Sequence, residues 1–211
     1  MQKTKLNSAL FLALVLAAPA LSAQVTEPNA LLQSVTLEVI AAMKQERALH
    51  DGNMKKVNNL VETKVLPLFD FSRMTQIAVA RNWRLATPEQ QAALTAEFRT
   101  LLVRTYSTVL SSYRDQVIEF RGMRSAPADT DVTVRSVVKQ SGTAPVAMDY
   151  DMEKTPAGWK VYDIKVAGVS LVTTYRDTFS ERIRDDGLDG LIKVLEEKNR
   201  QGDPRSGAPR T

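Results

Sequence analysis

The chain has 211 residues and no cysteine, so it is long enough for one domain with a substantial core, and disulfides play no part in its stability. Its net charge is +4, but Lys3 and Lys5 supply two of those charges, which leaves the rest of the chain close to neutral. This balance gives no indication of nucleic-acid binding, which would need a clustered basic face.

The first residues are typical of a secretory signal peptide. Lys3 and Lys5 precede an apolar run over residues 10–18, and the small residues Ala20, Ser22 and Ala23 allow cleavage after any of them. The alternative is a membrane anchor, but the run is shorter than the ~20 residues of a spanning helix. The end of the chain is rich in Gly, Pro and Arg, which is typical of disorder. We therefore predict a signal peptide over 1–23, a folded domain over 24–200 and a disordered tail over 201–211.

Helical spacing of apolar residues predicts three helices before residue 80. The first covers residues 29–49, and Asp51-Gly52-Asn53 separates it from a second helix that ends at Pro67. Asp70 is placed to cap a third, short helix that contains Phe71, Met74 and Ile77.

The segment Thr87-Pro88-Glu89-Gln90 predicts the start of the longest helix. Thr87 can accept hydrogen bonds from first-turn amides, Pro88 suits the first helical position, and Gln90 can complete a capping box. This helix is expected to run to about Tyr113 with a broad stripe formed by Leu94, Phe98, Leu101, Leu102, Thr105, Tyr106, Val109 and Tyr113.

Alternating apolar and polar residues then predict four strands, over 117–123, 132–139, 146–152 and 159–166. Gly142 and Pro156-Ala157-Gly158 lie where hairpin turns would connect them. Short links between consecutive strands indicate an antiparallel meander with one apolar and one polar face. Helical spacing returns from Val169 to Ile183, and Gly187 separates this helix from a last one over 189–198. The whole order predicts one α+β domain.

Candidate catalytic residues are few. His50 is the only histidine and lacks further ligands at metal-binding spacing, so a metal site is not expected. Ser170 lacks the second glycine of a hydrolase nucleophile motif, and we expect it to cap the following helix. Asp149, Asp151 and Asp163 leave an acid–base role open, although solvated carboxylates on the polar face of a sheet are commoner.

The apolar residues of helix 88–113 and of the strands at 132–138 and 146–152 admit two interpretations. They pack directly on one another as a filled core, or they line a cavity. Composition alone does not distinguish the two.

Two groups of short motifs favour the lined cavity over the filled core. The first is Phe69-Asp70-Phe71-Ser72-Arg73-Met74, Ala80-Arg81-Asn82-Trp83-Arg84 and Ala86-Thr87-Pro88-Glu89-Gln90. The second is Trp159-Lys160-Val161-Tyr162-Asp163-Ile164, Gly168-Val169-Ser170-Leu171-Val172-Thr173-Thr174-Tyr175-Arg176 and Asp186-Gly187-Leu188-Asp189-Gly190-Leu191. In order and spacing they resemble the MlaC family, also called toluene-tolerance proteins, over residues 30 to 200.

The resemblance implies an α+β fold with a curved four-stranded antiparallel sheet wrapped by helices, distantly like the cystatin and nuclear-transport-factor architectures. The sheet and helices would enclose an apolar cavity for the acyl chains of a phospholipid. The implied function is a periplasmic shuttle that maintains outer-membrane lipid asymmetry, has no enzymatic activity and carries phospholipid as cargo without a cofactor. Its implied partners are an inner-membrane MCE-type lipid-transport ATPase complex and an outer-membrane lipoprotein–porin complex.

Two other functions stay open: an enzyme of the nuclear-transport-factor type acting on a small apolar substrate, and a structural adaptor with a filled core. Under the carrier hypothesis, shared phase on the helix and strands predicts that the cavity is lined by Leu102, Tyr106, Val132, Val134, Val146, Met148, Tyr150, Trp159, Val161, Val169 and Val172. Reversible docking of partners is expected at basic residues near the mouth, namely Arg81, Arg84, Arg104 and Arg176.

Overall fold

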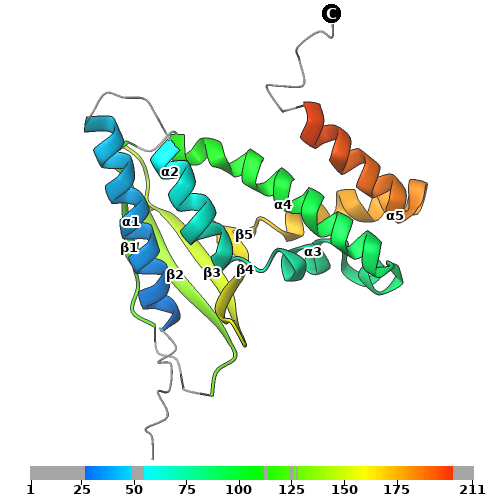
Figure 1. Cartoon of the computed structure of the whole chain (residues 1–211). Helices are drawn as coiled ribbons and strands as arrows, with labels where there is room; N and C mark the ends of the chain where they lie inside the picture. Colours follow the sequence, from blue (N-terminus) through cyan, green and yellow to red (C-terminus); the bar gives the residue numbers. More distant parts are fainter. Residues whose placement is uncertain (1–26, 49–54, 112–113, 124–125, 127, 202–211) are drawn as a thin grey trace, which may run out of the picture.

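The computed structural model describes residues 27–48, 55–111, 114–123, 126 and 128–201 (Figure 1). The predicted signal peptide, His50, the break at Asp51-Gly52-Asn53 and the tail after Gln201 lie outside the described residues. Within the described ranges, no helix combines the length and the apolar character that a membrane crossing requires.

The first helices pack on each other through a small hydrophobic cluster. The segments are α1 (Pro28–Ala48), α2 (Lys55–Leu60), the π-helical turn η1 (Val61–Val65) and the 3₁₀ turn η2 (Leu66–Leu68). Val39, Ala42 and Met43 of α1 are buried against Leu60 and Val65. The chain leaves η2 at Phe69, whose backbone bridges to Val161 in the sheet.

The next helix, α3 (Phe71–Val79), begins at the predicted cap. The Asp70 carboxylate accepts a hydrogen bond of 2.7 Å from the Arg73 amide, an interaction that typically contributes about 1 kcal/mol. The helix ends at Ala80, whose φ of 54° and ψ of −131° lie in a region that glycine favours. This turn directs the chain into the 3₁₀ segment η3 (Ala80–Leu85).

The long helix α4 (Pro88–Ser111) begins with the predicted capping box. The Gln90 amide donates to Thr87 Oγ1 over 3.2 Å, and the Thr87 amide donates to Gln90 Oε1 over 3.0 Å. Three members of the predicted stripe, Leu94, Phe98 and Leu102, are buried.

The sheet has five antiparallel strands in the order β1-β2-β3-β4-β5, which are Val117–Phe120, Asp131–Lys139, Val146–Thr155, Gly158–Val166 and Val169–Ser170. The first four are the predicted strands. The fifth is an addition, because Val169 pairs with Val166 in the sheet, whereas helical spacing placed it at the start of a helix. The β3–β4 register shifts between Asp151 and Met152.

The chain ends in α5 (Arg176–Gln201), which follows the 3₁₀ turn η4 (Thr173–Tyr175). The sequence predicts that Ser170 caps the following helix; its Oγ accepts a hydrogen bond of 2.9 Å from the Thr173 amide at the start of η4, but the N-cap residue of η4 is Val172 and Ser170 ends β5. Gly187 has a φ of 72° and interrupts α5 at the predicted break.

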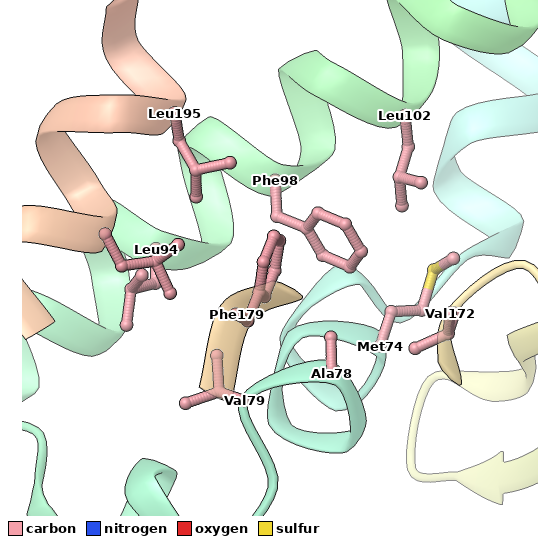
Figure 2. Close-up of a cluster of buried hydrophobic side chains, with 10 residues drawn as sticks. Met74, Ala78, Val79, Leu94, Phe98, Leu102, Val172, Phe179 and Leu195 are labelled. Atoms are coloured by element: carbon pink, nitrogen blue, oxygen red, sulfur yellow. The ribbon is translucent and has the colours of Figure 1, made fainter. Parts of the chain in front are cut away.

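These elements are arranged in two parts (Figure 1). α1 lies over one face of the sheet with α2 packed against it, whereas α3, α4 and α5 form a bundle beside the β4–β5 edge. The bundle core centres on Phe98, whose ring meets those of Tyr175 and Phe179 edge-on at 5.1 and 5.2 Å, beside Met74 and Ala78 of α3 (Figure 2). The predicted α+β class is therefore confirmed.

Candidate functional site

The strand register gathers apolar side chains on one face of the sheet. Val132 lies opposite Met152, Val134 opposite Tyr150, and Tyr150 opposite Ile164. Residues paired in this way point to the same side of the sheet, where their side chains contact one another.

One half of this apolar face is covered by α1. Leu32 packs there on buried residues of three strands, which are Val134, Met152, Trp159 and Val161. The Phe120 ring from β1 stacks on the Tyr150 ring with centroids 6.3 Å apart. This half of the sheet is a packed core.

The other half is apolar but incompletely covered. Val138, Met148 and Val166 are half-buried, Val146 is 39% exposed, and Val169 is 62% exposed. Val138 pairs with Val146, Met148 with Val166, and Val166 with Val169, so these five residues form one continuous patch from β2 to β5. We call this set the open patch. Large contiguous apolar patches are uncommon on monomeric proteins and are typical of surfaces that bind an apolar partner or ligand, which makes the open patch the candidate binding surface.

Among the described residues, the buried apolar side chains form three separate clusters, and no residue of the open patch belongs to them. One cluster joins α1 to η1, one joins α1 to the sheet, and one is the core of the helical bundle. Tyr106 packs on the bundle cluster and Tyr150 on the sheet cluster. Burial raises the pKa of both tyrosine hydroxyls, and the neighbouring Tyr175 adds to the increase at Tyr106.

The eleven residues predicted to line a cavity divide between these regions. Leu102, Tyr106 and Val172 belong to the bundle cluster. Val132, Val134, Tyr150, Trp159 and Val161 belong to the sheet cluster, and Val146, Met148 and Val169 belong to the open patch. That all of them border one void stays a prediction.

The carboxylates considered for acid–base chemistry lie on the opposite face of the sheet. Asp151 forms an ion pair with Lys165 at 2.6 Å, and this ion pair raises the pKa of Lys165. Asp151 also accepts a hydrogen bond of 2.8 Å from the Thr133 hydroxyl. Asp163 lies opposite Asp151 and accepts a hydrogen bond of 3.3 Å from the Val172 amide. Both carboxylates therefore have structural partners and point away from the open patch.

The described part of the chain holds no group of three or more His, Cys, Asp or Glu residues able to bind a metal ion. The four arginines predicted to dock partners are not all together. Arg81, Arg84 and Arg176 line one groove beside α3, whereas Arg104 lies on α4 and donates a hydrogen bond to the Asn199 carbonyl of α5.

Comparison with known proteins identifies the family. A sequence profile described as MlaC protein matches residues 33–197. The chain belongs to the MlaC family. It is 25% identical over 190 residues to a toluene tolerance protein of Pseudomonas putida, covering 88% of this chain and 86% of the relative. It is 20% identical over 179 residues to the intermembrane phospholipid transport system binding protein MlaC of Haemophilus influenzae, covering 83% and 84%.

The fold is also similar to that of a solved structure. The chain is 44% identical to a phospholipid-binding protein of Ralstonia solanacearum whose structure contains a phospholipid. The two structures superpose with a TM-score of 0.72, over 82% of this chain and 97% of that chain.

Several residues on the apolar face of this MlaC-family chain escaped the sequence analysis. Val166 and Ile164 are out of phase with Trp159 and Val161 under strict alternation, and only the register shift in the sheet brings all four to one side. Ile118 and Phe120 share the face as well, and the alternation in 117–123 is the signal that could have identified them.

Proposed function

We propose that this protein is a phospholipid carrier that holds acyl chains against the apolar face of its sheet. The observation that supports this most directly is the open patch, a continuous set of valine and methionine side chains that belong to none of the three buried clusters. The phospholipid in the related Ralstonia structure supports the same type of cargo.

Elementary energetics explain why such a carrier is needed. Two acyl chains expose roughly 30 methylenes, and at ~0.8 kcal/mol each their contact with water costs about 25 kcal/mol. That cost exceeds the ~18–21 kcal/mol of the tightest non-covalent complexes, so unassisted diffusion through water is negligible. A site as apolar as the bilayer offsets most of the cost, and transfer to and from a membrane complex is then nearly balanced.

We place this carrier in the periplasm, where it exchanges phospholipid with an inner-membrane MCE-type ATPase complex and an outer-membrane lipoprotein–porin complex and so maintains outer-membrane lipid asymmetry. The signal-like residues 1–23 and the name of the Haemophilus relative support this assignment. The carrier role is non-enzymatic. In support, Asp151 and Asp163 are engaged by Lys165 and the Val172 amide on the face away from the open patch.

A transfer assay between vesicles tests the proposed function. Donor vesicles contain a self-quenched fluorescent phosphatidylglycerol, acceptors contain none, and purified protein is added at increasing concentration. We expect the initial rate of dequenching to increase in proportion to protein concentration, and Val146→Arg to abolish the increase. A rate independent of protein concentration would contradict the proposal.

A further inference from the structure

A groove separate from the apolar face of the sheet lies between α3, η3 and the start of α5. Its volume is about 940 Å³, and its lining includes four arginines and three large apolar side chains, namely Arg73, Arg81, Arg84, Arg176, Ile77, Trp83 and Leu85. None of the described residues that line the groove is a carboxylate. The groove therefore combines positive charge with apolar surface.

The positive charge of this groove is largely uncompensated. In the described ranges, the side chains of Arg81 and Arg84 form no ion pair or hydrogen bond, and both residues are exposed. Arg176 donates its Nε hydrogen to the Ile77 carbonyl over 3.2 Å, and Arg73 has Glu153 at 3.7 Å. Arginines close together in a groove repel one another, so an occupant carrying carboxylates would relieve the repulsion.

Hydrogen bonds fix the elements that form the groove relative to one another. The Gln91 side-chain amide donates to the carbonyls of Trp83 and Ala86 over 3.0 and 3.4 Å, which fixes the end of η3 on α4. The Gln90 amide group donates to Asp189 over 2.7 Å, which ties α4 to α5. At the other end of η3, Ala80 keeps a backbone conformation that costs a non-glycine residue about 1–3 kcal/mol. A preformed groove loses little conformational entropy when a partner binds.

An apolar contact is available at the rim. Leu85 is 75% exposed, the most exposed of the large hydrophobic residues in the described part of the chain, and the half-buried Trp83 lies two residues before it. Tryptophan and arginine are the side chains that most often dominate binding energy in protein interfaces.

We propose that this groove is the docking surface for a partner-protein segment in which carboxylates flank an apolar side chain. The segment would belong to the membrane complexes that exchange lipid with the carrier, so this inference rests on the proposed function. A concave groove fits a protruding protein segment, whereas an anionic bilayer is flat and would meet only the rim. None of the eleven predicted cavity-lining residues lines the groove, so docking and cargo are separable.

The test compares two charge-reversal pairs in the full-length protein. Arg81→Glu with Arg84→Glu alters the groove, and Lys154→Glu with Lys193→Glu makes the same change in net charge at exposed positions outside it. Binding is measured by biolayer interferometry to the purified MCE-domain subunit, to the purified lipoprotein–porin complex, and to vesicles with 30% phosphatidylglycerol. Leu85→Ser tests the apolar contact, and bound phospholipid is quantified in every variant.

We expect the groove pair to raise the Kd for at least one complex by tenfold or more, Leu85→Ser to raise the same Kd severalfold, and the control pair to change neither. Bound phospholipid should stay at the wild-type amount. Unchanged affinity for both complexes, an equal effect of the control pair, or a loss confined to vesicles would overturn the docking assignment, as would loss of phospholipid from the groove variant. Wild-type protein that carries no phospholipid would instead contradict the proposed function.

Discussion

Single residues on the β2–β3 pair differ in their access to water. Val134 is fully buried under α1, whereas Val146, toward the other end of the same pair, is 39% exposed. A charged side chain is tolerated where it can reach water and is costly where it cannot. The two valines therefore allow the open patch to be tested against the packed core beside it.

Val146→Arg is expected to leave the protein folded but without phospholipid, because the guanidinium reaches water while it occupies the open patch. Val134→Arg is expected to unfold the domain, since an unpaired buried charge costs several kcal/mol, comparable with a typical free energy of unfolding. Thermal unfolding and the phosphorus content of the purified proteins measure the two effects. A folded Val146→Arg protein with its full phospholipid load would show that the patch does not hold cargo.

The half-buried Tyr106 and Tyr150 predict how the stability of the protein changes at alkaline pH. Burial raises the pKa of Tyr106 and Tyr150 above the usual value of 10.0, so the folded protein keeps these protons after the unfolded chain has released them. The free energy of unfolding must then fall as pH rises above 10, by about 1.4 kcal/mol per pH unit for each whole proton.

Urea unfolding between pH 9 and pH 11.5 measures this slope. Tyr150→Phe removes one of the titrating groups and is expected to make the slope less steep, whereas it should have no effect on the slope between pH 7 and pH 9. An identical alkaline slope in both proteins would mean that Tyr150 ionises as readily in the folded state as in the unfolded chain.

At the scale of elements, ion pairs between strands differ in burial and therefore in value. Lys165 and Asp151 join β4 to β3 at 2.6 Å, and the Asp151 side chain is only 11% exposed. Lys139 and Glu119 join β2 to β1 at 2.7 Å with both side chains about half exposed. Removing the lysine leaves the buried Asp151 charge with the Thr133 hydroxyl but without an ion partner, whereas an exposed carboxylate is solvated by water.

Lys165→Met is accordingly expected to lower the free energy of unfolding by about 1–3 kcal/mol, and the matched Lys139→Met by less than about 1 kcal/mol. Chemical denaturation of both variants at pH 7 gives the two values directly. Equal losses would show that Asp151 is as well solvated as Glu119 once its lysine is removed.

Local signals in the sequence were sufficient for most elements. The Thr87–Gln90 capping box, the Asp70 cap and the break at Gly187 depend on contacts within a few residues, and the structure confirms each of them. Non-local hydrogen bonds decide the rest. β5 exists because Gly168 and Ala167, with φ of 83° and 50°, turn Val169 back onto Val166, and apolar spacing contains no trace of that turn.

The strand faces could be predicted from the sequence, but the arrangement of the candidate residues in space could not. Alternation correctly placed Val134 and Tyr150 on one face, because partners in an antiparallel pair point to the same side. The distances between the predicted arginines could not be predicted in this way: Arg81 and Arg84 line the groove, whereas Arg104 lies against α5. That separation depends on how α4 packs in the bundle, which the spacing of apolar residues does not determine.

At the scale of the whole molecule, the structure combines a packed helical bundle with a sheet whose apolar face is only partly covered. The bundle of α3, α4 and α5 is packed around Phe98, and it carries the basic groove on its outside. The sheet is packed beneath α1 at one end and leaves the open patch at the other. We infer that the bundle binds the partner complexes and that the sheet binds the phospholipid.

The central claim is that the protein carries phospholipid, and native mass spectrometry of protein purified without detergent from the periplasm of a bacterial host tests it most directly. We predict a folded protein whose mass exceeds that of the polypeptide by one or more phospholipids, which dissociate as intact lipid on collisional activation. Val146→Arg, purified in the same way, should give the mass of the polypeptide alone. A folded wild-type protein with the mass of the polypeptide alone would contradict the account.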